Sequence, residues 1–409
     1  MARYIVKFGG TSVANIDRIK HVAGLVARMA HDGHEIVVVV SAMAGMTNQL
    51  VGYTKSLCST HITSEHDVVT ASGEQITVGL MALALQQLNL KSISYLGFQI
   101  KIKTDATHTN AKIDHISTRI LEESLVNGII PVVAGFQGIS NNNRLTTLGR
   151  GGSDTTAVAL AAVLNADRCD IYTDVEGVYT ADPRVVYNAR KLNAISHTEM
   201  LELAAQGAKV LHPRCVELSL RYNINMQVLS SFNLVSGTQI INEETLMEQT
   251  SIRGIAHNLS EAKVTIESIN PITPRMMADL FSALSREHIA IDMIAYVNAG
   301  QGLKNTLNFI VNKDDSVRAN VKIMELKSII GFDTLAIDPN IVKISIVGIG
   351  IRSNLEITPL VFQTLADHQI DIQMVTTSEI KIGLIIAHDH MTKAISVLHD
   401  ALQLGASTE

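Results

Sequence analysis

Continuous apolar runs alternate along the first half of the chain with segments whose apolar residues recur at helical spacing. The continuous runs are bounded by polar residues, which is typical of strands buried on both faces of a sheet. Strands are expected at 5–8, 35–41, 129–134 and 170–173. Helices are expected at 16–30 and 153–164, with Ser153 or Asp154 at the start of the second. This order predicts a layered α/β domain with a mostly parallel sheet.

The pattern changes near residue 235, where the polar, aperiodic stretch 236–250 predicts a linker between residues 1–235 and the C-terminal part of the chain. Beyond the linker, five apolar positions recur at an offset of 81 residues (362 − 281). Phe281, Leu284, Ile289, Ile291 and Met293 align with Phe362, Leu365, Ile370, Ile372 and Met374. The flanking strand and helix patterns predict two βαββαβ units, at 251–335 and 336–409. The matched positions are core positions, so the repeat alone says little about ligands.

Composition narrows the class of protein. The chain has 409 residues, of which 46% are hydrophobic, which is ample for a packed core. Its net charge of −6 argues against a non-specific nucleic-acid binder. The three cysteines show no CxxC spacing and fit free thiols in a reducing compartment. We expect no leader and no apolar run long enough to cross a membrane, and therefore a cytoplasmic protein.

The first strand ends in VKFGGTS, which resembles an anion-binding turn. Lys7 brings a positive charge, and Gly9 and Gly10 let a phosphate approach the backbone because they lack a Cβ. Thr11 and Ser12 are expected at the start of the following helix, whose N–H groups would point at the anion. The segment lacks the Walker A pattern, and an ordinary strand–turn–helix connection is the alternative.

A second glycine-rich segment, LGRGGSDTT, carries Arg150 and Asp154. Arginine suits bidentate recognition of a carboxylate, and an aspartate can meet an ammonium group. Together they fit an α-amino acid, which presents both groups on one carbon. The alternative is a capping pair at a helix start, but a cap does not require the three glycines of this segment.

Three further residues are weaker candidates. Glu74 follows a glycine in SGEQ, where it could simply complement a helix dipole. Tyr179 lies in an acidic loop after a strand, at the sheet edge where ligands bind, unless the loop is merely solvated. Lys209 lies near a helix end, where most lysines are solvated.

The histidine pairs His31 with His34 and His388 with His390 lack further ligands at metal-binding spacing, so no protein metal site is expected.

The chain resembles the aspartate kinases of the amino-acid kinase superfamily in five segments. In chain order these are VKFGGTSV, SGEQ, LGRGGSDTTA, TDVEGVYTADPR and GAKVLHP. The C-terminal segments SIVGIGIRS and TTSEIKI resemble the paired ACT domains of that family. The resemblance covers essentially the whole chain. It implies a three-layer sandwich, the amino-acid kinase fold, followed by two ferredoxin-like ACT domains. It also implies phosphorylation of the L-aspartate β-carboxylate by ATP and Mg²⁺, the first step of lysine, threonine, methionine and diaminopimelate biosynthesis.

The resemblance also implies roles for individual residues. The catalytic set is Lys7, Gly9, Gly10 and Asp154. The substrate-binding set is Ser41, Thr47, Glu74, Arg150, Gly151 and Ser153. The ATP-binding set is Lys7, Phe8, Gly9, Gly10, Thr173, Asp174, Tyr179, Asp182, Arg184, Lys209 and Val210.

Regulation is where the chain departs from the family. The ACT pair implies a homodimer, or a higher homo-oligomer, and feedback by lysine or threonine. The implied effector contacts are Asp279, Ile291, Asp292 and Ile294. The usual Pro-Gly turn reads Pro274-Arg275, the second copy has Leu355-Glu356, and Tyr296 replaces a common glutamine. We therefore expect weakened or altered feedback. Met247 stands where some members start a short second subunit.

Two other functions remain open. One is an amino-acid sensor with a degenerate kinase domain, which the retained Lys7, Glu74, Arg150, Asp154 and Lys209 disfavour. The other is a kinase for glutamate, acetylglutamate or a nucleoside monophosphate, which the double ACT tail disfavours.

Overall fold

The computed structural model describes residues 1–58, 63–233, 235–242, 251–299 and 304–405. Met247 therefore lies outside the described residues. The chain forms two compact units. Unit 1 comprises Met1–Tyr179, Lys191–Ala205 and Lys209–Gln249, and unit 2 comprises Thr180–Arg190, Gln206–Ala208 and Thr250–Glu409.

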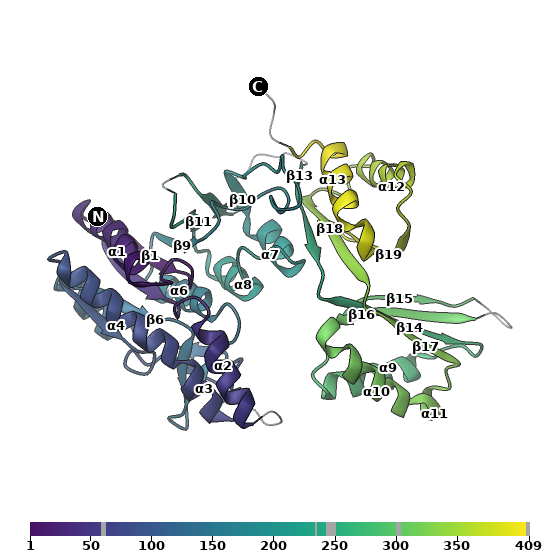
Figure 1. The fold of residues 1–409 in the computed structure, drawn as a ribbon, viewed down its shortest axis with the longest axis horizontal. Helices are drawn as coiled ribbons and strands as arrows, with labels where there is room; N and C mark the ends of the chain where they lie inside the picture. The colour runs from purple at the N-terminus through teal and green to yellow at the C-terminus, as the bar shows by residue number, and fades with distance from the viewer. Residues whose placement is uncertain (59–62, 234, 243–250, 300–303, 406–409) are drawn as a thin grey trace. The chain divides into compact units, whose positions relative to one another are not determined.

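Unit 1 is built on an eight-stranded sheet (Figure 1). In spatial order its strands are β10 (Ala194–Ser196), β12 (Thr238–Ile241), β11 (Met226–Ser230), β9 (Arg168–Thr173), β1 (Arg3–Phe8), β2 (Glu35–Val40), β6 (Ile130–Ala134) and β3 (Ser92–Tyr95). Every neighbouring pair is parallel except β11 with β12. The predicted mostly parallel α/β sheet is confirmed. β12 lies inside the stretch expected to be a linker, so the sheet extends further along the chain than expected.

Helices cover both faces of this sheet, and the alternation of side chains along β1 decides what each face receives. Val6 and Phe8 belong to a core cluster with residues of α1 (Ile16–His31) and α4 (Ser72–Gln87). Lys7 lies between them in the strand, so its side chain points to the opposite face. That face packs against α6 (Gly152–Val163). The central strands are continuous apolar runs because both of their faces are covered.

The remaining elements of unit 1 surround the sheet. The helices are α2 (Met46–Leu57), α3 (Ser64–Thr70), α5 (Arg119–Val126), α7 (His197–Ala205) and α8 (Pro213–Tyr222). A small second sheet has the order β5 (Ile113–His115), β4 (Lys103–Thr104), β7 (Gln137–Ser140) and β8 (Leu145–Thr147). Helix α8 packs on α6, and α3 packs on β8.

Helix α1 begins at Ile16, as the expected range 16–30 predicts, but the polar residues expected at the starts of α1 and α6 are not their caps. Helix α1 begins after Asn15, whose side chain accepts a hydrogen bond from Arg18 N at 2.9 Å, rather than at the hydroxyl pair Thr11 and Ser12. Helix α6 begins at Gly152, and its N-cap is Gly151. Gly151 has a left-handed φ of 71° and provides no side-chain hydrogen bond to the helix. The glycines therefore shape the start of α6, which frees the side chain of Asp154 for another contact.

In unit 2, the first repeat forms the predicted βαββαβ order. Its elements are β14 (Glu261–Ser268), α9 (Pro274–Arg286), β15 (Ile291–Val297), β16 (Asn305–Asn312), a 3₁₀ turn (Lys313–Asp315), α10 (Ser316–Glu325), α11 (Lys327–Ile330) and β17 (Thr334–Asp338). The sheet order is β15-β16-β14-β17, and the helices lie along one face of it (Figure 1). The alternating burial of β14 reflects a sheet with one covered face.

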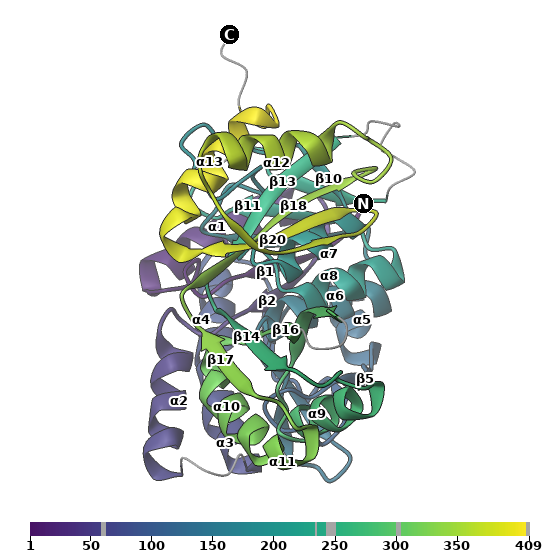
Figure 2. The same ribbon diagram turned by 90° about the vertical axis from the view of Figure 1, so that its right-hand side faces the viewer.

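The second repeat recruits a strand from elsewhere in the chain. It contains β18 (Ile341–Ile349), α12 (Ile357–Asp367), β19 (Ile372–Thr377), β20 (Lys381–Ala387), a 3₁₀ turn (His388–His390) and α13 (Met391–Ala401). Helices α12 and α13 pack together (Figure 2). The sheet order is β13-β18-β20-β19, with β13 (Ser251–Asn258) antiparallel to β18. Residues expected to open the first repeat thus supply the fourth strand of the second, in the place that β17 has in the first.

The stretch Ser64–Gln87 is the one part of the described chain that is long and apolar enough to cross a membrane. It spans 24 residues and contains an 18-residue window with a mean hydropathy of 1.4, so the sequence-based expectation that no such run exists is wrong by length and composition. Half of its apolar window is buried inside the structure, as in a core helix of a soluble protein. A single helix of this kind is weak evidence for a membrane span.

Candidate active site

The carboxyl ends of β1, β2 and β9 meet at one edge of the large sheet. Phe8 is level with Val40 of β2 and with Tyr172 of β9. The residues near these strand ends, Gly9, Ser41 and Thr173, therefore emerge side by side. Ligands of parallel α/β sheets bind at this edge.

Lys7 and Asp154 form a mostly buried ion pair at this edge. The Lys7 Nζ atom lies 2.5 Å from Asp154 Oδ1, and the side chains are only 9% and 14% exposed. The pair forms because β1 directs Lys7 toward α6, whose first turn carries Asp154. A cation at this strand end is compatible with the catalytic role that the sequence predicts for Lys7. Asp154 is thereby engaged with Lys7 rather than free for a substrate ammonium group.

The glycine turn differs in one respect from the expected anion cradle. The Gly9 N–H donates to Tyr172 O at 3.0 Å, so it is not available to a phosphate. The Gly10 N–H has no backbone partner among the residues that the structure describes. A Cβ on Gly10 would lie 3.0 Å from Ala42 O, and one on Gly9 would lie 3.5 Å from Lys7 Nζ. Gly10 therefore packs closely against Ala42, whereas a Cβ on Gly9 would make only ordinary van der Waals contacts.

Glu74 is the most unusual carboxylate of the site. Its side chain is buried at the start of α4, where its Oε1 atom accepts a hydrogen bond from Ala42 N at 3.0 Å. The Oε2 atom is buried and has no hydrogen-bond partner among the described residues. Burial raises the pKa of Glu74 to about 7, although the bond from Ala42 opposes the rise. An unsatisfied buried carboxylate oxygen is costly, so Glu74 is a candidate to bind a cationic group.

The Arg150 loop is shaped by glycines in left-handed conformations. Gly149 has a φ of 80° and Gly151 a φ of 71°. A Cβ on Gly151 would lie 2.2 Å from the Cβ of His212, so any other residue would displace that ring. Arg150 itself is exposed and makes no ion pair in the part of the chain that the structure describes. Its guanidinium is thus available to a ligand, while Ser153 is buried against Gly135.

Other predicted site residues are distributed over both units. In unit 1, Thr173 Oγ1 donates to Asp174 Oδ1 at 3.0 Å, and Tyr179 donates to Glu176 at 3.3 Å. Thr47 lies in the first turn of α2, Lys209 is exposed, and Val210 is half-buried. Asp182 and Arg184 belong to unit 2, where they bond to each other at 2.7 Å. The predicted ATP-binding set is therefore divided between the two units.

Sequence reasoning missed His212, although it lies in the motif that drew attention to Lys209. Its Nδ1 atom accepts a hydrogen bond from Arg214 N at 3.3 Å, which places the ring proton on Nε2. Burial lowers the pKa of His212, so the ring is neutral at physiological pH. The ring packs against Gly151 and so buttresses the loop of Arg150. A histidine immediately before the proline of a helix start was the available signal.

Of the implied effector residues of unit 2, the two carboxylates already have partners within the chain. Asp279 pairs with Arg275 at 3.2 Å, one helical turn away in α9. Asp292 pairs with the buried Lys343 of β18, which lowers the pKa of Asp292 against the effect of its burial. Ile291 is half-buried in β15, and Ile294 is exposed.

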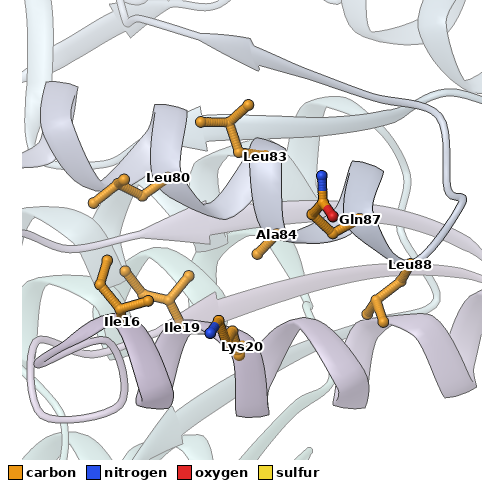
Figure 3. Close-up of a pocket in the computed structure, with 8 residues that line it drawn as sticks. All are labelled: Ile16, Ile19, Lys20, Leu80, Leu83, Ala84, Gln87 and Leu88. Atoms are coloured by element: carbon orange, nitrogen blue, oxygen red, sulfur yellow. The ribbon is translucent and has the colours of Figure 1, made fainter.

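Unit 1 also contains an apolar groove. It has a volume of about 430 Å³ and lies between α1 and α4 (Figure 3). Its lining is Ile16, Ile19, Lys20, Leu80, Leu83, Ala84, Gln87 and Leu88. Among the described residues no group of three His, Cys, Asp or Glu side chains is arranged to hold a metal ion.

The sheet, the Lys7–Asp154 pair and the glycine turns define a kinase domain of the amino-acid kinase type. Residues 2–230 match the amino acid kinase family, and residues 344–402 match the ACT domain. The chain is 44% identical to the aspartokinase of Pseudomonas aeruginosa and 43% identical to aspartokinase 2 of Bacillus subtilis. Each alignment covers 99% of this chain and 98% of the relative. The chain therefore belongs to the aspartokinase family.

Solved structures agree with this assignment. The fold is similar to that of E. coli aspartokinase III in complex with aspartate and ADP, with a TM-score of 0.83. That match has 24% identity and covers 98% of this chain and 99% of the other, so it supports the fold alone. The aspartate kinase of Synechocystis is 35% identical, with a TM-score of 0.54 over 99% of this chain and 70% of that one.

The buried Glu74 generates a prediction about stability. The pKa of Glu74 is about 7 in the fold against an ordinary value of 4.5. Folding favours the protonated form, so stability falls as the pH rises through this window. The difference between the two values corresponds to about 3 kcal/mol.

We expect E74Q to be more stable than the wild type at pH 8. The difference in the free energy of unfolding between E74Q and the wild type should be about 2–3 kcal/mol larger at pH 8 than at pH 5. Thermal or urea unfolding of both proteins without ligands at the two pH values measures this. A stability difference that does not change between pH 5 and pH 8 would contradict the account of Glu74.

Proposed function

We propose that the chain transfers the γ-phosphoryl group of ATP to the β-carboxylate of L-aspartate, giving 4-phospho-L-aspartate and ADP. The observation that carries the proposal is the site geometry in a chain of the aspartokinase family. Three local observations support it. Lys7 pairs with Asp154 of α6, and Arg150 lies two residues before the start of that helix. Glu74 is bonded to Ala42, just after β2, and among the described residues neither its Oε2 atom nor the Arg150 guanidinium has a hydrogen-bond or ion-pair partner. This reaction opens lysine, threonine, methionine and diaminopimelate biosynthesis.

The chemistry requires charge neutralisation more than a base. The β-carboxylate is already ionised at neutral pH, so it attacks phosphorus without losing a proton. A carboxylate oxygen forms the new bond to Pγ, and the bond from Pγ to the bridging oxygen breaks with its electron pair leaving on ADP. Two anions must be brought together, so positioning and fixed positive charge supply the rate enhancement. Lys7 and the Gly10 N–H are the groups for that task.

Two side chains suit the amino acid itself. The free Oε2 of Glu74 would accept the α-ammonium group, whose positive charge compensates the burial of the carboxylate. The Arg150 guanidinium would bind a carboxylate of the substrate through two parallel hydrogen bonds. Asp154 acts on Lys7 instead, because the ion pair fixes the lysine ammonium at the sheet edge.

The nucleotide would occupy the neighbouring loops. Thr173, Asp174, Tyr179 and Lys209 suit ribose, base and phosphates, and the E. coli relative was solved with ADP. Mg²⁺ keeps most of its water and binds mainly to phosphates, so the phosphates of the nucleotide would be its main ligands. Asp174, exposed after β9, offers one carboxylate. When bound, the ion would offset the charge of the transferring phosphate.

The ACT units suggest assembly and feedback. We infer a cytoplasmic homo-oligomer joined through these units, since exposed sheet edges and apolar residues such as Ile294 and Val297 remain on them. Lysine is bound in one solved relative, the T-state of E. coli aspartokinase III. Here the carboxylates of Asp279 and Asp292 are already paired, so an amino-acid effector must compete with Arg275 and Lys343.

A first prediction concerns the substrate. The wild type should release ADP with L-aspartate and not with glutamate, N-acetylglutamate or UMP. K7M should lower kcat by at least about 10²–10³-fold, because one fixed donor to the developing charge is lost. A coupled ADP-release assay measures both. An inactive wild type would favour the sensor function, and near-normal kcat in K7M would refute the role of Lys7.

A second prediction separates the two substrates. R150A removes the carboxylate partner and nothing from the nucleotide loops, so the KM for aspartate should rise about 10–100-fold. The KM for ATP should stay within about twofold. K101A, which changes an exposed lysine after β3, serves as a control. An unchanged aspartate KM in R150A would count against its role.

A third prediction concerns feedback. Inhibition by lysine or threonine should be weak, with half-inhibition above the micromolar range, because paired carboxylates must give up their partners. R275A should strengthen any inhibition by releasing Asp279. Initial rates with each amino acid added in turn test this. Tight inhibition of the wild type would show that the pairing does not limit the effector.

A further inference from the structure

Asp67 is a fully buried carboxylate that joins three segments of unit 1. It lies in α3, and its side chain is completely inaccessible. Thr147 Oγ1 of β8 donates to Asp67 Oδ1 at 2.6 Å. Thr109 N donates to both carboxylate oxygens, at 3.1 and 3.3 Å, and His108 Nδ1 lies 2.6 Å from Oδ2. None of these residues belongs to the catalytic or binding sets.

On one side, Asp67 is connected to Glu74. The two residues are seven positions apart in a helical stretch that is interrupted only at Ala71. Seven residues are about two helical turns, so the two side chains lie on one face about 10 Å apart. The Ala71 N–H donates to Asp67 O at 3.0 Å, which continues the hydrogen bonding across the interruption. Anchoring Asp67 therefore anchors the start of α4 and Glu74 with it.

On the other side, Asp67 is connected to Arg150. Its partner Thr147 is the last residue of β8, three positions before Arg150. The Ala111 N–H donates to Thr147 O at 2.9 Å, which ties the strand end to the segment that also bonds Asp67. Gly149 packs closely on this same segment, since a Cβ there would lie 2.9 Å from Thr109 O.

Arg214 reinforces this arm of the network. Its Nη1 atom donates to Leu148 O at 2.6 Å and its Nη2 atom donates to Ala111 O at 2.7 Å. The backbone that leads into Arg150 is thus held from two directions, and Arg150 itself stays exposed. The start of the loop cannot move without breaking bonds to Asp67 or to Arg214.

We propose that Asp67 is a positioning residue that sets the spacing between Glu74 and Arg150. The inference rests on the proposed function, in which these two side chains hold the ammonium and a carboxylate of aspartate. A ligand that is gripped at both ends needs its two partners at a fixed separation, and small misplacements cost affinity and rate. A buried carboxylate with several hydrogen bonds fixes position more sharply than apolar packing does. Asp67 acts through Glu74 and Arg150 and does not touch the substrate.

The test uses two adjacent buried threonines of β8. T147V deletes the hydroxyl that bonds Asp67 and preserves the shape of the side chain. T146V is the matched control, because Thr146 Oγ1 bonds Thr104 Oγ1 at 2.7 Å instead. T147S keeps the hydroxyl and should rescue the function. The variants are compared by steady-state kinetics in the full chain, with Tm measured for each.

We expect T147V to raise the KM for aspartate about tenfold or more, with the KM for ATP within about twofold of the wild type. T146V and T147S should remain near the wild-type aspartate KM. H108F, which removes another bond to Asp67 from a partly exposed position, should change the aspartate KM in the same direction. It provides the measurement if T147V fails to fold.

Equal effects of T146V and T147V on the aspartate KM, or loss of affinity for both substrates alike, would overturn the positioning role. An unchanged aspartate KM in both T147V and H108F would do the same. These outcomes differ from a failure of the proposed function, in which the wild type itself would not phosphorylate aspartate.

Discussion

The register of β1 between β2 and β9 is the constraint on which the site depends. Because side chains alternate along a strand, the register that buries Val6 and Phe8 on one face must turn Lys7 to the other. There the first turn of α6 presents Asp154, and the resulting ion pair keeps a cation at the carboxyl edge of the sheet. A slip of one residue would bury the lysine among α1 and α4 and leave no charge beside the glycine turn.

The site concentrates polar groups that a stability-optimised core would avoid. Lys7, Glu74 and Asp67 are all buried, and they differ in the partners that compensate the burial of their polar groups. Lys7 has a counterion, and Asp67 has hydrogen bonds to both of its oxygens. Glu74 keeps one oxygen unsatisfied and so favours its protonated form. Lys7 and Asp67, whose partners lie within the chain, fix the geometry of the site. Glu74, whose Oε2 atom has no hydrogen-bond partner among the described residues, is suited to bind a ligand.

Local signals in the sequence predicted much of this arrangement and missed the parts that depend on distant partners. Strand periodicity and the glycine-rich segments predicted β1, α6 and the positions of Lys7 and Arg150, and the structure confirms those elements. The pairing of Gly9 N with Tyr172 O could not be read from the turn, because it depends on where β9 lies. Asp67 was not singled out since a lone aspartate in a helix has no local signature. Residues 251–258 were included in the first repeat because nothing local in a strand specifies which sheet it joins.

Chain connectivity offers a physical route from the ACT units to the nucleotide loops. The segment after Tyr179 is fixed in unit 2, where Thr180 O accepts from Ile255 N at 2.7 Å and the Thr180 hydroxyl lies 3.0 Å from His399 Nε2. A second segment, Gln206–Ala208, is fixed there by the bond between Gln206 and Ser345 at 3.0 Å, immediately before Lys209. Of the two proposed ATP contacts, Tyr179 therefore directly precedes a residue bonded to β13 and α13, and Lys209 follows three positions after a residue bonded to β18. Since β13 and β18 share a sheet, we expect a change of packing there to act on both positions through the backbone.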